Sequence, residues 1–129
     1  MHDRPTVDEM LRAVETLFDE QLIPALQGAP QYNARVAANV VRTVRRELQH
    51  EEAQLEQEWA GLEALLGRAE KPEGLQSLRI AIAERNGELS ERIRAGDADD
   101  GEWRRSVFAH VRDTVQAKLE VANPKWLEG

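Results

Sequence analysis

Residues 32–59, YNARVAANVVRTVRRELQHEEAQLEQEW, contain neither glycine nor proline, the two residues that most readily end a helix. Large apolar residues recur at helical spacing in the second half of this region and beyond it: Leu55, Trp59, Leu62, Leu65 and Leu66. We therefore predict one long helix over residues 31–66 that stops at Gly67. A pair of helices separated near His50 is an alternative that the length of the region leaves open.

The segment before this helix has the signals of a shorter, interrupted helix. Thr6 and Glu9 have the spacing of a capping box, in which each residue satisfies an unpaired N–H of the other. Pro24 cannot donate to a helix and restricts the residue before it, so we expect a kink there. The helix should stop at Gly28, with Ala29-Pro30 forming the turn.

Two further helices follow residue 66. Residues 67–74 read as a loop, and the third helix should end at Gly96. Asp99, with Glu102 three residues later, is the expected cap of a fourth helix that ends at Asn123. The fourth helix should turn one apolar stripe inward: Val107, Phe108, Val111, Val115 and Leu119.

These segments predict an all-α fold, an up-and-down four-helix bundle with a long second helix and a kinked first helix. The length of 129 residues fits one domain. We therefore predict a single helical domain over residues 1–129, with residues 1–5 and 123–129 as terminal extensions.

The composition excludes several function classes. The net charge of −7 argues against a nucleic-acid partner and against an anionic membrane surface. The chain has no cysteine, so it has no disulfide and no thiolate site. The N-terminus lacks the apolar region of a signal peptide, and no apolar run is long enough to cross a membrane. A cytoplasmic location is therefore expected.

The long helix nevertheless concentrates positive charge. Residues 31–48 contain four arginines and one glutamate. Arg35, Asn39, Arg42 and Arg46 are spaced by four, three and four residues, which places them on one face of a helix. The opposite, wider arc is apolar and rich in alanine and valine, as in a helix that packs closely on its neighbours.

Two interpretations of this arginine face stay open. The four residues could be solvated or paired with carboxylates of the same chain. Alternatively they form a partner-binding or anion-binding site, since guanidinium groups bind carboxylate and phosphate in a bidentate manner. Asn39 favours the second interpretation, because asparagine is uncommon in a helix interior unless its amide has a partner.

The sequence gives no sign of catalysis. Glu47 and His50 have the Glu-x-x-His spacing of a di-iron site, but such a site needs a second pair of this kind, which the sequence lacks. No glycine-rich phosphate loop and no Ser-His-Asp arrangement is apparent. We expect no catalytic residues, no metal site and no cofactor, and therefore a protein that is not an enzyme.

Trp126 lies in the C-terminal tail after Asn123-Pro124. Its ring would either attach the tail to the helices or form part of an interface. We take it as a candidate interface residue.

Seven short motifs, in this order and spacing, resemble a family of small bacterial helical proteins catalogued as a domain of unknown function. They are DRPT (3–6), LIPAL (22–26), ARVAAN (34–39), RREL (45–48), LLG (65–67), RIRAG (92–96) and KLEVANPKW (118–126). The resemblance covers nearly the whole chain and is weakest over residues 68–91.

Members of that family are encoded beside aminoglycoside-phosphotransferase-like kinases and often beside acyl-CoA dehydrogenases. One branch includes the small subunit of the kinase that phosphorylates 4-hydroxyacyl-CoA in levulinic acid breakdown. The resemblance implies a non-catalytic accessory subunit with a kinase partner and with acyl-CoA as a further ligand at a shared site. The alternatives are a self-associating structural or regulatory bundle, including a homodimer, and a stand-alone protein that binds CoA or another anion.

Overall fold

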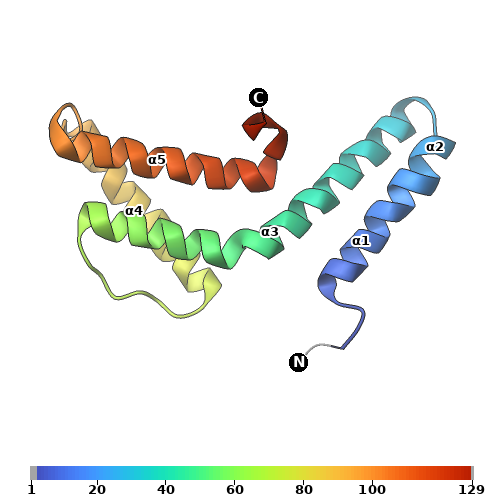
Figure 1. The fold of residues 1–129 in the computed structure, drawn as a ribbon, viewed down its shortest axis with the longest axis horizontal. Coiled ribbons are helices and arrows are strands. Elements are labelled where there is room, and N and C mark those ends of the chain that lie inside the picture. Colours follow the sequence, from blue (N-terminus) through green and yellow to red (C-terminus); the bar gives the residue numbers. More distant parts are fainter. Residues whose placement is uncertain (1–2, 129) are drawn as a thin grey trace. The chain divides into compact units, whose positions relative to one another are not determined.

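The computed structural model describes residues 3–128, and Figure 1 shows that the regular elements among them are helices. The elements are α1 (Val7–Leu17), η1 (Phe18–Leu22), α2 (Ile23–Ala25), α3 (Gly28–Leu66), α4 (Leu75–Arg94), α5 (Gly101–Ala122) and η2 (Pro124–Leu127). The predicted all-α bundle class, with an interrupted first helix and a long second helix, is confirmed.

The chain divides into two compact units, residues 1–49 and residues 50–129. The first unit is a hairpin of α1 with the N-terminal part of α3, and the second contains the remainder of α3 with α4 and α5 (Figure 1). Helix α3 runs without interruption through His50, so the long helix is confirmed and the break does not occur. That the whole chain is one domain stays a prediction.

The predicted cap starts the first helix. The N–H of Glu9 donates to Thr6 Oγ1 at 3.2 Å, and the N–H of Thr6 donates to Glu9 Oε1 at 3.5 Å. Arg4 Nε donates to the same carboxylate at 3.1 Å. This hydrogen bond holds the pKa of Glu9 below its ordinary value; burial opposes this effect, and the hydrogen bonds from Thr6 add to it. The carboxylate therefore stays charged and keeps the helix capped near neutral pH.

The expected kink occurs as a widened turn just ahead of Pro24. This proline has no N–H for the helix ladder, and its ring crowds the carbonyl one turn back. The chain forms the π-helix η1 there, and the N–H of Ile23 bonds to the carbonyl of Phe18, five residues earlier. Helix α2 then ends at Ala25, and Leu26 is extended.

The turn between the two helices of the hairpin is shorter than predicted. Gly28 has a φ of +66°, a conformation that glycine adopts without steric cost, and α3 begins at this residue rather than near Gln31. Residues 29 and 30, expected to form the turn, belong to the first turn of α3, where the missing N–H of proline is not needed. Gln31 Nε2 donates to the carbonyl of Ile23 at 2.9 Å and ties the two helices together.

The second unit has the larger apolar core, built from three helices. Seven buried side chains form it: Trp59, Leu62, Leu65, Leu78, Ile82, Leu89 and Val107. Polar contacts add to this packing. Gln54 Nε2 donates to the carbonyl of Ala117 at 2.9 Å. Trp103 Nε1 donates at 3.1 Å to the carbonyl of Leu65 at the end of α3, which also accepts a longer hydrogen bond from Arg92 Nη1 at 3.4 Å. Trp59 is a buried member of this core, and Trp103 packs against it.

Helix α5 turns a different face to the core than predicted. Val107 is buried and Leu119 half-buried, whereas the other members of the predicted stripe are 41–56% exposed: Phe108, Val111 and Val115. The inward face instead includes Trp103 and His110, and the ring of His110 lies directly against Gly61 of α3. Residue type alone favours the apolar stripe of α5 as the inward face. In the structure the inward face is instead the one that carries His110, because Gly61 leaves room for its ring.

The cap of α5 also differs from the prediction. Asp100, not Asp99, occupies the N-cap position, and its side chain makes no capping hydrogen bond. The first helical residue, Gly101, has a φ of +85°, so the backbone enters the helix by a sharp turn that glycine permits.

Gly61→Ala should destabilise the second unit. The added Cβ would lie 2.2 Å from His110 Nδ1, so the ring would have to leave its place against α3. We expect a net loss of about 1–2 kcal/mol in the free energy of unfolding, because the steric cost exceeds the gain in helix propensity. Urea denaturation followed by circular dichroism measures it.

Gly87→Ala is the matched control. Gly87 also lies inside a helix, but a Cβ there meets nothing within 4 Å. This variant should gain up to about 1 kcal/mol from helix propensity. Equal responses of the two variants would contradict the close approach of α3 and α5.

Candidate functional site

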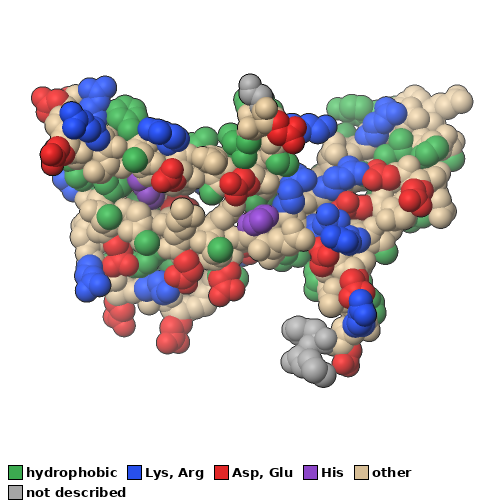
Figure 2. Space-filling model, in the orientation of Figure 1, with side chains coloured by type: hydrophobic (Ala, Val, Ile, Leu, Met, Phe, Trp, Pro, Cys, Tyr) green, Lys and Arg blue, Asp and Glu red, His purple; other side chains and the backbone are tan. Residues whose placement is uncertain are grey.

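A network of charged side chains joins the two helices of the hairpin. Glu15 lies between two arginines, with 2.7 Å from Arg45 Nη1 to Glu15 Oε1 and 3.6 Å from Arg42 Nε to Glu15 Oε2. Arg42 Nη2 also pairs with Asp19 Oδ2, and Arg45 Nε lies 3.4 Å from Asp8 Oδ1. In Figure 2, basic and acidic side chains lie next to one another over this part of the hairpin. We call these five residues the ion-pair network.

The network is shielded from water more than ordinary surface pairs are. The side chains of Glu15, Arg45 and Arg42 are 13%, 22% and 29% exposed. The hydrogen bond to Asp19 raises the pKa of Arg42 above its ordinary value, partly opposed by burial and helped by the charges of Asp19 and Glu15. Partial burial reduces screening, so these pairs contribute more than exposed ones.

Part of the network is held together by attraction between charges without well-formed hydrogen bonds. Glu15 Oε1 and Arg45 Nε are buried, and neither has a hydrogen-bond partner in favourable geometry among the described residues. Removal of one charge would therefore leave buried groups without compensation, which costs more than the pair itself contributes.

Sequence reasoning missed most of this network. Asp8, Glu15 and Asp19 are spaced by seven and four residues, so they share one face of the first helix. That spacing was a usable signal, because an acidic face of this kind would suit the arginine face of the next helix. Arg45 lies outside the predicted arginine face, yet it contacts two of these carboxylates.

The structure brings two of the four predicted arginine-face residues, Asn39 and Arg42, into contact with each other. Asn39 Oδ1 accepts a hydrogen bond from Arg42 Nη1 at 3.0 Å, which gives the mid-helix asparagine a role in orienting that guanidinium. Arg46 Nη2 donates to Thr43 Oγ1 at 3.3 Å. Arg42 pairs with Glu15 and Asp19, which fits the interpretation that the arginine face is paired with carboxylates of the same chain. That the set also binds a partner or an anion stays a prediction.

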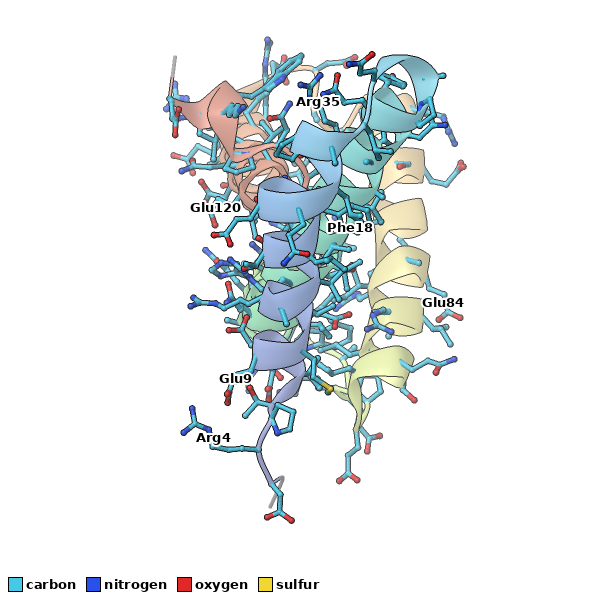
Figure 3. The ribbon with its side chains drawn as sticks, turned by 90° about the vertical axis from the view of Figure 1, so that its right-hand side faces the viewer. Arg4, Glu9, Phe18, Arg35, Glu84 and Glu120 are labelled. Carbon is cyan, nitrogen blue, oxygen red and sulfur yellow. The ribbon has the colours of Figure 1, made fainter. Side chains whose placement is uncertain are left out.

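Arg35 differs from the other members of the set. Figure 3 shows it near the end of the hairpin that lies opposite Arg4 and Glu9. It is exposed, and within residues 3–128 it takes part in no ion pair. Of the predicted site residues, Arg35 therefore presents the most accessible guanidinium.

Trp126 lies in η2, directly after α5, and is 74% exposed. A ring with this exposure contributes little to attaching the tail to the helices. The candidate interface role stays a prediction.

Arg85 is a buried cation that sequence reasoning also missed. It is 8% exposed, its guanidinium lies 5.6 Å from the ring centroid of Trp59, and Nη1 has no hydrogen-bond partner among the described residues. Its position follows from the helical spacing of Leu78, Ile82 and Leu89, with which it shares the inward face of α4. The ring of Trp59 offsets part of the cost of burying this charge.

The hairpin also exposes a large apolar surface. Seven side chains on its two helices are 39–56% exposed: Val7, Met10, Val14 and Leu17 on α1, and Val40, Val44 and Leu48 on α3. We call this set the hairpin apolar face. It comes in part from the arc of α3 that was predicted to be packed against neighbours.

These seven residues lie on one side of the hairpin. Val14 directly precedes Glu15, and Val44 directly precedes Arg45, and Glu15 and Arg45 face each other. One residue back along a helix is a rotation of about −100°, and in an antiparallel pair this rotation turns both side chains to the same side. Asp19 and Arg42 pair on the opposite side. The hairpin therefore separates the side of the ion pairs from a mainly apolar side, with Glu47 at the edge of the latter.

Two further findings concern the described part of the chain. Within residues 3–128, no group of three or more histidine or acidic side chains is placed to hold a metal ion. None of the helices there is both long enough and apolar enough to pass through a bilayer.

The comparisons with known proteins give one match. The family model of a domain of unknown function, DUF6285, matches residues 24–126, which include all of α3, α4 and α5. No curated protein and no solved structure matches the chain.

Glu15→Gln should loosen α1 from α3. The substitution keeps the shape of the side chain but removes the charge shared by Arg42 and Arg45. We expect a loss of about 1–3 kcal/mol in unfolding free energy and faster amide hydrogen exchange in α1. Glu20→Gln is the control, since Glu20 is exposed and lies outside the network. Identical melting temperatures for the two variants would contradict the role of Glu15.

Proposed function

We propose a function from the premise that this chain belongs to the family of the domain of unknown function DUF6285. The protein is a non-catalytic accessory subunit of an aminoglycoside-phosphotransferase-like kinase that acts on hydroxyacyl-CoA in the cytoplasm. The kinase identity comes from the family resemblance. The observation in the structure that supports a binding role is the apolar surface that the second unit leaves uncovered.

That surface follows one stripe of α5. Phe108, Val111 and Val115 are spaced by three and four residues, and each is more than 40% exposed. The guanidinium of Arg104 lies 5.3 Å from the ring centroid of Phe108. Exposed apolar side chains that adjoin one another on a helix are candidates for a protein–protein contact.

The tail adds an aromatic residue to the same unit. Trp126 is the most exposed large hydrophobic residue in the described part of the chain. Tryptophan and arginine are the residues that most often dominate the binding energy of an interface. We therefore assign the contact with the kinase to the outward stripe of α5 and to Trp126.

A division of labour between the two proteins is chemically reasonable. A kinase of this class carries its own nucleotide and magnesium machinery, so a helper protein needs none. CoA brings several phosphates, and Arg35 has an exposed guanidinium that suits one of them. Acyl-CoA would then be held at a site shared by helper and kinase, with Arg35 as the contribution of this chain.

The interface assignment predicts the effect of Trp126→Ala. The chain is co-expressed, with a tag on it alone, with the phosphotransferase-like protein encoded nearest to it, and the captured kinase is quantified. We expect capture in fixed stoichiometry by the unmodified chain and at least about tenfold weaker binding by the variant. Ile80→Ala is the control, because Ile80 is 56% exposed but lies on α4, outside the α5 stripe.

Absence of a complex, with or without acyl-CoA, would contradict the accessory role itself. Equal losses from Trp126→Ala and Ile80→Ala would contradict the assigned surface. Arg35→Glu separates the CoA contact from the kinase contact: it should weaken binding of CoA to the assembled complex and leave capture of the kinase unchanged.

A further inference from the structure

The hairpin apolar face is a second uncovered surface, on the other unit of the chain. Its seven members are apolar: Val7, Met10, Val14 and Leu17 on α1, and Val40, Val44 and Leu48 on α3. The exposed carboxylate of Glu47 lies at its edge, beside Leu48, while the ion pairs of Arg42 with Glu15 and Asp19 lie away from it. A partner that covers these seven side chains therefore buries apolar surface without burying a charge beneath it.

The size of the face is that of an interface. The exposed fractions of the seven side chains correspond to on the order of 600 Å² of apolar surface, at the upper end for the largest patch of a monomer. Each partner of a standard stable complex buries roughly 800 Å². The seven side chains supply most of that area, and the backbone and smaller residues around them supply more.

The shape of α3 beside the face suits another helix. A shallow open hollow lies on α3, and Val40 and Val44 belong both to it and to the hairpin apolar face. Four of its lining residues have the i, i+3, i+4, i+7 spacing of the hole that receives a side chain in helix–helix packing: Val36, Asn39, Val40 and Thr43.

Charge favours a second copy of the chain as the occupant. Residues 3–49 carry seven carboxylates and six arginines, so two hairpins approach with almost no net repulsion. Residues 50–129 carry seventeen carboxylates and eleven basic residues, and pairing through that part would bring like charges together. An apolar face is also complementary to itself under a two-fold axis, the commonest symmetry of soluble oligomers.

We propose that the hairpin apolar face is the contact between two copies of this chain, whose hairpins pair to form a four-helix assembly. Each hairpin by itself is two helices with one open side, and pairing closes that side as in a four-helix bundle. The pairing requires no kinase, and it leaves the α5 stripe and Trp126 free for a different partner.

Sedimentation equilibrium of the purified chain, without kinase, tests the pairing. We expect a mass of twice 14.6 kDa that falls to the single-chain value on dilution, and a melting temperature that rises with protein concentration. Met10→Asp and Val40→Asp each place a charge on the face and should raise the dimer dissociation constant at least about tenfold.

Ile80→Asp is the matched control. Ile80 is 56% exposed, like Val40, but it lies on α4 in the second unit, so this variant should remain a dimer. A single-chain mass for the unmodified protein at all concentrations overturns the inference and leaves the face to another partner. Dimers of unchanged affinity in both face variants overturn it as well. The unmodified chain alone decides the first outcome, so the test does not depend on how the variants fold.

Discussion

The carboxylate of Glu15, shared by Arg42 and Arg45, is the contact on which the arrangement of the hairpin depends. Charges attract their partners to one side of an antiparallel helix pair, and the residues one position earlier then face the other side. The exposed apolar surface of the hairpin is thus a consequence of where the ion pairs form. A helix pair with randomly placed charges would have no such apolar side.

Local signals predicted the elements well. The capping box at Thr6, the disturbance before Pro24 and the stop at Gly67 all depend on residues a few positions apart, and each is found in the structure. The absence of helix-breaking residues likewise predicted the unbroken course of α3. The start of α3 was three residues off, because proline in a turn and proline in a first helical turn have the same sequence signal.

Helical periodicity does not predict contacts between segments that are far apart in the sequence. Arg42 meets Asp19, which lies 23 residues away, and nothing in the spacing of the arginines identifies that partner. The inward face of α5 depends on Gly61 leaving room for His110, a contact between residues almost fifty positions apart. The charge pattern therefore identified one face of α3 as a candidate site, while the carboxylate partners of that face and the uncovered apolar side became visible only in the structure.

The two units present different uncovered surfaces. The hairpin offers an apolar face, and the second unit offers an apolar stripe on α5 within an acidic surface. A protein that pairs through the first and binds a kinase through the second would bring two kinases together in one assembly. In such an assembly the hairpin determines how many copies are present, and the second unit determines what they bind.

The central claim is that two copies of the chain pair through the hairpin apolar face. The most direct test asks whether the Met10 methyl contacts the second copy. The chain has two methionines, so a sample labelled with ¹³C at the methionine methyls gives few signals, and Met10→Leu assigns the relevant one. In an equimolar mixture of labelled and unlabelled chains, isotope-filtered nuclear Overhauser spectra detect contacts between copies. We predict contacts from the Met10 methyl to valine or leucine methyls of the second copy. A Met10 methyl without contacts between copies, and fully accessible to a soluble paramagnetic probe at high protein concentration, would contradict the claim.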